Sequence, residues 1–157
     1  MDSAAAALLV QDFREQWRVI EEVYQRVEKR RLVVSNAPAS VEGLAYQLHN
    51  LYGACEQLFE LIARAFENRI DARQYHVDLL RRMRTEIEGV RPALLDSTEL
   101  ERDLHELRAF RHFFRHAYAV ELKSETVEVV AEAADRIRAP LKAALDRFGS
   151  AIVGNAP

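Results

Sequence analysis

One stretch of the sequence, residues 105–116, concentrates side chains that can bind a phosphate and move a proton. It holds three of the five histidines of the chain and three arginines, with Glu106 as its only acid. The cationic residues are His105, Arg108, Arg111, His112, Arg115 and His116. A histidine can transfer a proton at pH 7, and an arginine offers a fixed fork of donors to a phosphate and to its transition state. Together they are the minimum set for phosphodiester chemistry.

A helical repeat separates these residues into three faces. At ~100° per residue, one face is apolar and should enter a core; it comprises Leu107, Phe110, Phe113, Phe114 and Ala117. Arg111, Arg115 and Tyr118 fall within roughly 60° of one another on a second face, and the histidines line a third face. Because acids are nearly absent from the segment, we expect a cationic outer face without the acidic partners that usually accompany a solvated helix.

Two other interpretations of this face stay open. Charge on a helix is commonly just a solvated surface. His112 and His116 are also four residues apart, the spacing at which two imidazoles can share a zinc ion, with His49 or His76 as a source of a third ligand. The flanking arginines would repel a dication, however. We therefore expect no metal and no cofactor, and we interpret His49 and His76 as structural side chains.

Apolar residues recur at steps of three and four almost throughout the chain, which predicts helices. We expect them over residues 3–32, from Ser40 to 66, from Asp71 to Gly89, from Thr98 to about Leu122, and from Ser124 to Gly149. Pro140 should kink or split the last helix, and residues 150–157 should form a flexible tail. Short connections make sequential helices antiparallel, so the expected fold class is all-α, an up-and-down bundle of about five helices with the second helix at its centre.

The overall composition bounds the function. A chain of 157 residues fits one domain, which we place at residues 1–149. The net charge of −3 excludes a globally basic nucleic-acid-binding protein but not a local basic site. The single cysteine, Cys55, excludes an intrachain disulfide and is most simply a core residue. No apolar run approaches the ~20 residues of a membrane helix, so we expect no membrane contact and a cytoplasmic location.

The segment 110–118 resembles the HepT-type toxins of the HEPN superfamily of helical ribonucleases. The signature of that group looks like the pattern found here, in which four residues separate Arg111 from His116 and one residue separates His116 from Tyr118. The resemblance extends to residues 46–52 and 75–83. It implies a HEPN-like helical domain and a toxin of a toxin–antitoxin system. The implied activity is a metal-independent endoribonuclease that works as a homodimer, in which the motif helices of two protomers form one composite cleft.

The resemblance also implies roles for individual residues. Arg111 and His116 would be the catalytic pair, and His112, Arg115 and Arg108 would support RNA binding. His112 stands where many HEPN proteins have asparagine or another polar residue, which adds a second titratable group. Arg111 and His116 are ~140° apart around a helix, so one copy does not aim both at one point, whereas two copies related by a two-fold axis can.

The partners implied by the resemblance are RNA and an antitoxin. HepT-type toxins are paired with an MntA-like minimal nucleotidyltransferase, which adds AMP to the motif tyrosine, here Tyr118. Cleavage by the 2′-OH of the RNA would leave DNA inert. Two other classes remain open: a non-catalytic HEPN module that binds a nucleotidyltransferase, and a helical structural interaction protein.

Overall fold

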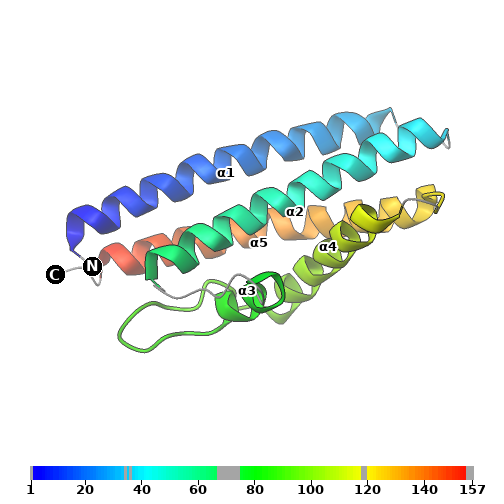
Figure 1. The fold of residues 1–157 in the computed structure, drawn as a ribbon. Coiled ribbons are helices and arrows are strands. Elements are labelled where there is room, and N and C mark those ends of the chain that lie inside the picture. Colours follow the sequence, from blue (N-terminus) through cyan, green and yellow to red (C-terminus); the bar gives the residue numbers. More distant parts are fainter. Residues whose placement is uncertain (1, 34, 36, 67–74, 118–119, 155–157) are drawn as a thin grey trace.

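The computed structural model describes residues 2–33, 35, 37–66, 75–117 and 120–154, except for the side chains of 75–78. This part of the chain forms five helices and no strand, which confirms the predicted all-α bundle (Figure 1). The helices are α1 (Ser3–Leu32), α2 (Pro38–Phe66), α3 (Tyr75–Arg84), α4 (Thr98–His116) and α5 (Ser124–Gly154). None of the described helices is long and apolar enough to cross a membrane.

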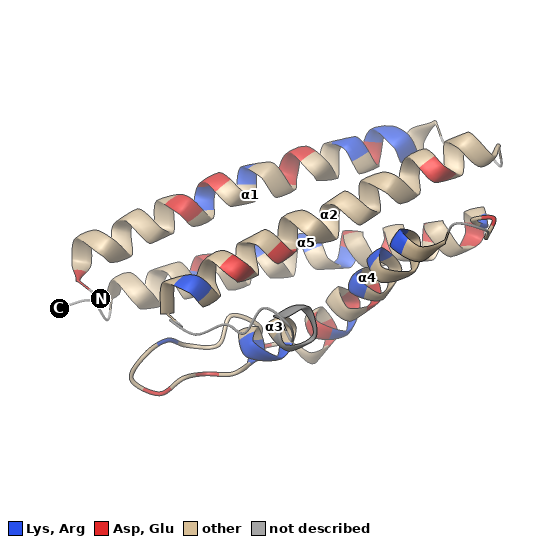
Figure 2. Cartoon of the chain, in the orientation of Figure 1, with Lys and Arg blue, Asp and Glu red and all other residues tan. Residues whose placement is uncertain are grey.

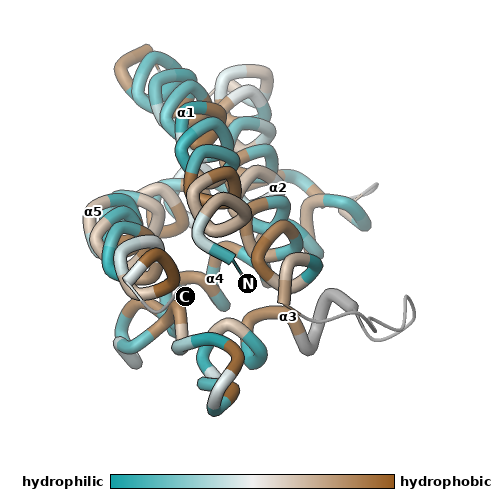
Figure 3. Tube along the Cα trace, turned by 90° about the vertical axis from the view of Figure 1, so that its left-hand side faces the viewer, coloured by the Kyte–Doolittle hydropathy of each residue, from teal (hydrophilic) through white to brown (hydrophobic). Residues whose placement is uncertain are grey.

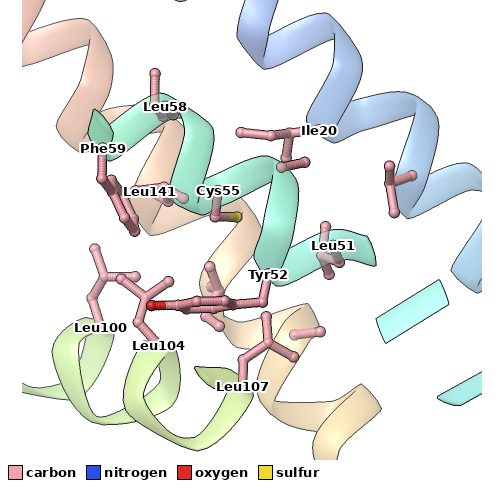
Figure 4. Close-up of a cluster of buried hydrophobic side chains, with 14 of the residues drawn as sticks. Ile20, Leu51, Tyr52, Cys55, Leu58, Phe59, Leu100, Leu104, Leu107 and Leu141 are labelled. Atoms are coloured by element: carbon pink, nitrogen blue, oxygen red, sulfur yellow. The ribbon is translucent and has the colours of Figure 1, made fainter. Parts of the chain in front are cut away.

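The second helix is central, as its apolar stripe predicts. α2 packs against each of the other four helices. Hydrophobic and hydrophilic residues are interspersed within the turns of the helices, as in amphipathic elements around one core (Figure 3). Figure 4 shows Tyr52 of α2 reaching toward α4, where Leu104 and Leu107 flank its ring; Tyr52 and both leucines are buried. At the level of Tyr52, the α2–α4 contact is therefore made mainly by buried apolar groups.

Polar contacts fix α1 against α5. The Tyr24 hydroxyl donates a 2.8 Å hydrogen bond to the Ala134 carbonyl. Arg138 of α5 pairs with Glu21 and Glu28 of α1 at 2.5 Å each, and its guanidinium lies 4.8 Å from the centre of the Tyr24 ring. These contacts join residues more than 100 positions apart, so they stabilise the long-range packing of the bundle rather than a single helix.

Two helix boundaries of the sequence prediction are wrong near the motif. α2 begins at Pro38, not at Ser40; a proline fits the first turn because its missing N–H would have no partner there. α4 ends at His116, with Ala117 as its C-cap, and not at Leu122. No glycine or proline lies at this point of the sequence, so the sequence carries no helix-stop signal there.

The last helix is longer than expected. Gly149 does not end α5, which continues to Gly154 with Ile152 buried. A Cβ at Gly149 would lie 3.4 Å from Cγ2 of Val10, an ordinary van der Waals distance, so α1 packs against α5 at this residue. Residues 150–154, expected in a flexible tail, are thus helical, and 155–157 lie outside the described residues. Pro140 does not split α5, and its ring is exposed.

The expected third helix also has different bounds. Its predicted start, Asp71, lies outside the described residues, and α3 ends at Arg84 instead of Gly89. Ile87 lies in a turn, where it forms a bridge with Arg91. Gly89 adopts a φ of 71° in this turn, a left-handed conformation that glycine tolerates best. The turn returns the chain toward the start of α4.

Candidate functional site

Residues 110–116 of the motif lie in the C-terminal half of α4. Contacts near the N-terminal end fix this helix in the bundle. The Ser97 side chain caps the helix by accepting a hydrogen bond from the Leu100 N–H at 3.2 Å. Arg136 of α5 donates two hydrogen bonds to the buried Asp103 carboxylate, at 3.0 and 3.1 Å. Figure 2 shows acidic residues toward the start of α4 and basic residues toward its end. This order complements the helix dipole, so the basic end is a stable feature of the helix.

His112 and His116 lie together at the exposed end of α4. Their ring centres are 4.6 Å apart, and both side chains are exposed. Nδ1 of His116 lies 2.8 Å from the His112 carbonyl oxygen. Because a carbonyl only accepts hydrogen bonds, Nδ1 carries the hydrogen, which leaves Nε2 of a neutral His116 free to accept a proton. The local backbone therefore orients His116 as a base.

Arg111 is not on a free cationic face, and that expectation is wrong. Its Nη1 donates a 2.7 Å hydrogen bond to Glu56 of α2. The side chain of Arg111 is 22% exposed and that of Glu56 is 7% exposed. The guanidinium lies against the backbone of α2, where a Cβ at Gly53 would be 3.9 Å from Nε. The acid that pairs with Arg111 thus lies on α2, so the residue spacing within α4 does not reveal it.

Nε of Arg111 remains without a partner inside this contact. It is buried and has no hydrogen-bond acceptor among the described residues. The guanidinium is therefore anchored through Nη1 on one side, and its donors are only partly used. An arginine held in this way is pre-oriented, because its long side chain has little rotamer freedom left to lose on binding an anion.

His49 of α2 joins the same site. Its ring centre is 5.3 Å from that of Phe114, and its Nδ1 is buried without a hydrogen-bond partner in the described part of the chain. Burial, followed by the nearby charges of Arg111 and Arg115, lowers the pKa of His49, while Glu56 acts in the opposite direction. The neutral imidazole is therefore favoured. The sequence interpretation of His49 as an ordinary structural residue missed its place beside the motif.

The remaining predicted residues lie in different surroundings. Arg115 is exposed, whereas Arg108 is half-buried. Phe113, expected in the core, is 40% exposed. Of the neighbouring phenylalanines of α4, Phe110 is buried and Phe114 is partly buried. Tyr118 lies outside the described residues.

A metal centre is not formed by the described side chains. No group of three or more His, Cys, Asp or Glu residues that could hold a metal ion occurs among them. His49 therefore does not complete a ligand set with His112 and His116, and the side chain of His76 lies outside the described residues.

The comparison with known families decides the relationship of the chain. A family model described as HepT-like protein matches residues 43–152. The chain belongs to the HepT-like family. The match includes most of α2, all of α3 and α4, and most of α5, and thus every described residue of the site. This membership associates the HepT-like chain with toxin-like HEPN proteins, a group generally linked to ribonuclease activity. Neither the curated proteins nor the solved structures gave a match.

Proposed function

We propose that this HepT-like protein is the toxin of a toxin–antitoxin system and acts as a metal-independent endoribonuclease. The observation that supports this best is the orientation of His116. Its Nδ1–H is held by the His112 carbonyl at the exposed end of α4, so Nε2 is available for proton transfer beside exposed Arg115. Within the match to the HepT-like family, this arrangement supplies the proton-transfer group that RNA cleavage requires.

The chemistry assigned to the site is transesterification within the RNA. A histidine takes the proton of the 2′-OH, the 2′ oxygen attacks the adjacent phosphorus, and the bond to the 5′ oxygen breaks. A second proton-transfer group protonates the leaving 5′ oxygen, so a 2′,3′-cyclic phosphate and a free 5′-OH result. Arg111 stabilises the charge that develops on the phosphate. DNA lacks the attacking hydroxyl and is not cleaved.

The site is proposed to be completed by a second copy of the chain. In one chain, Arg111 is directed at Glu56 of α2, whereas His116 is exposed at the end of α4. The two groups therefore do not meet in one protomer. A two-fold axis beside α4 would bring two arginines and two pairs of histidines around one phosphate. Arg108, His112 and Arg115 then support RNA binding.

Control by a MntA-like nucleotidyltransferase antitoxin completes the proposal. Tyr118 follows His116 by two residues, and an AMP group on it would place a bulky anion next to the basic end of α4. Co-expression with the antitoxin should give a mass increase equal to AMP on Tyr118. A Tyr118→Phe variant should escape silencing, and full silencing of that variant would refute the assignment.

A second candidate is a non-catalytic binding module for a nucleotidyltransferase. One observation favours it: Arg111, the proposed phosphate ligand, already pairs with buried Glu56. In this case the basic end of α4 binds a partner without cleaving RNA.

Alanine variants of two histidines on α4 distinguish the candidates. His116→Ala should reduce RNA cleavage by a factor on the order of 10²–10⁴, because general acid–base catalysis is lost. His105→Ala is the matched control: it removes a histidine that lies near Glu101, 3.8 Å away, in the other half of the helix. Circular dichroism checks that both variants keep their helices. Full cleavage by a folded His116→Ala variant would remove His116 from the mechanism. No cleavage by the folded wild-type protein would leave the binding module as the function.

A further inference from the structure

Four residues of α2 form one stripe that faces the motif helix. Tyr46, His49, Gly53 and Glu56 are spaced by three, four and three residues, which places them on the same side of a helix. Glu56 and Gly53 contact Arg111, and His49 contacts Phe114. Tyr46 is the outermost member of the stripe, and the proposed reaction assigns it no task.

Tyr46 is the outer end of a row of aromatic rings that begins in the core. Phe110 is buried, and its ring centre is 6.1 Å from that of Phe114. Phe114 is 5.3 Å from His49, and His49 is 6.4 Å from Tyr46 with an interplanar angle of 20°. Tyr46 itself is 53% exposed. A large ring is thus presented to solvent on a rigid support.

The antiparallel packing of α2 and α4 places this ring near the C-terminal end of α4. Arg111 lies opposite Gly53, and Phe114 lies opposite His49. Three further residues along each helix bring Tyr46 level with Ala117, the C-cap of α4. The charges of Arg111 and Arg115 act on His49, the neighbour of Tyr46. An exposed aromatic ring and a basic helix end therefore occupy the same region of the surface.

We propose that Tyr46 is a stacking platform for an unpaired base of the RNA, next to the phosphate that is cleaved. Every nucleobase has a face that stacks on an aromatic ring, and bases in an A-form duplex are not available for it. The substrate class is therefore single-stranded RNA with weak sequence preference at this position. This inference rests on the proposed ribonuclease function for the place of the phosphate.

The test measures binding and cleavage separately. The probe is a single-stranded RNA that carries 2-aminopurine, whose fluorescence is quenched on stacking. It is titrated into His116→Ala protein, alone and combined with Tyr46→Ala, with Tyr46→Phe, or with Val129→Ala. Val129 is a matched control on α5, with an exposure of 52%. Tyr46→Ala should weaken binding about 5- to 150-fold and abolish the quench. Tyr46→Phe keeps the ring and should bind normally, as should the Val129→Ala control.

A duplex of the same strand supplies the second arm of the experiment. It should resist cleavage by the wild-type protein, and its binding should not depend on Tyr46. Equal affinity and equal quench with and without Tyr46, in folded protein, would overturn the stacking proposal.

The outcomes for the two proposals are distinguishable. If the wild type cleaves RNA, His116→Ala does not, and Tyr46→Ala behaves as its parent, the stacking inference alone fails. If the wild type does not cleave RNA but Tyr46→Ala loses binding and quench, the ribonuclease function fails, and Tyr46 remains a base-binding residue.

Discussion

The contact between Glu56 and Arg111 gives the sharpest quantitative test of the site geometry. Glu56→Gln removes the negative charge at nearly constant size, and Arg111→Met removes the positive charge. Net hydrogen bonds to charged groups contribute about 1.5–3 kcal/mol to stability, and breaking a fully buried pair costs about 3–5 kcal/mol. Arg111 is 22% exposed and Glu56 7%, so water screens the pair in part. We expect a coupling energy of about 2 kcal/mol.

A double-mutant cycle measures this coupling directly. Urea unfolding of the wild type, both single variants and the double variant is followed by circular dichroism at one protein concentration. For a chain of this size, 2 kcal/mol corresponds to about 4–8 °C in Tm. The pair between Arg147 and Asp96, each 57% exposed, is the control, with an expected coupling of about 0.2–1 kcal/mol. A coupling between Glu56 and Arg111 no larger than that of the control would show that the pair does not form in solution.

Four further results are expected. As the pH falls through about 6.5, the wild type should lose stability relative to His49→Gln. The reason is that the pKa of His49 is lowered in the folded chain, so the unfolded chain binds the proton first. The same change of urea midpoint between pH 8 and 5.5 in both proteins would contradict this. RNA cleavage should survive EDTA, and loss of activity with recovery on adding zinc or magnesium would make the histidines ligands. Arg115→Ala should lower the salt dependence of log Kd for single-stranded RNA by about 0.7, and an unchanged slope would remove Arg115 from the phosphate contacts. Sedimentation at micromolar concentration should show a dimer, and a monomer alone would count against the composite site.

Much of the fold could be predicted from the sequence because helical periodicity is a local property. The long apolar stripes of α1, α2 and α5 determine the helices and the central place of α2. The helix ends were less predictable, because residue type alone does not fix them. Gly149 is a stop signal by its type, yet it lies within α5, where Val10 of α1 packs against it. α4 stops after His116 although no residue there breaks a helix.

The site was predictable only along a single helix. The basic end of α4 follows from residues within one segment, so spacing rules reveal it. The partners of Arg111 and Phe114 come from α2, more than 50 positions away, and no local pattern pairs them. The stripe of Tyr46, His49, Gly53 and Glu56 is visible in the sequence as spacing, but its direction becomes clear only when α2 and α4 are placed side by side.

The close approach of Val10 and Gly149 has a practical consequence for labelling. It places the start of α1 and the end of α5 at the same end of the bundle, where both lie in Figure 1. Tyr46 of α2 lies near the level of residue 24 of α1, since Gln16 reaches the Ala54 carbonyl and Arg30 lies over Gly43. About 20 helical residues, or roughly 30 Å at 1.5 Å each, therefore separate the site from both ends. A fluorophore, affinity tag or surface tether attached at either end leaves the site open.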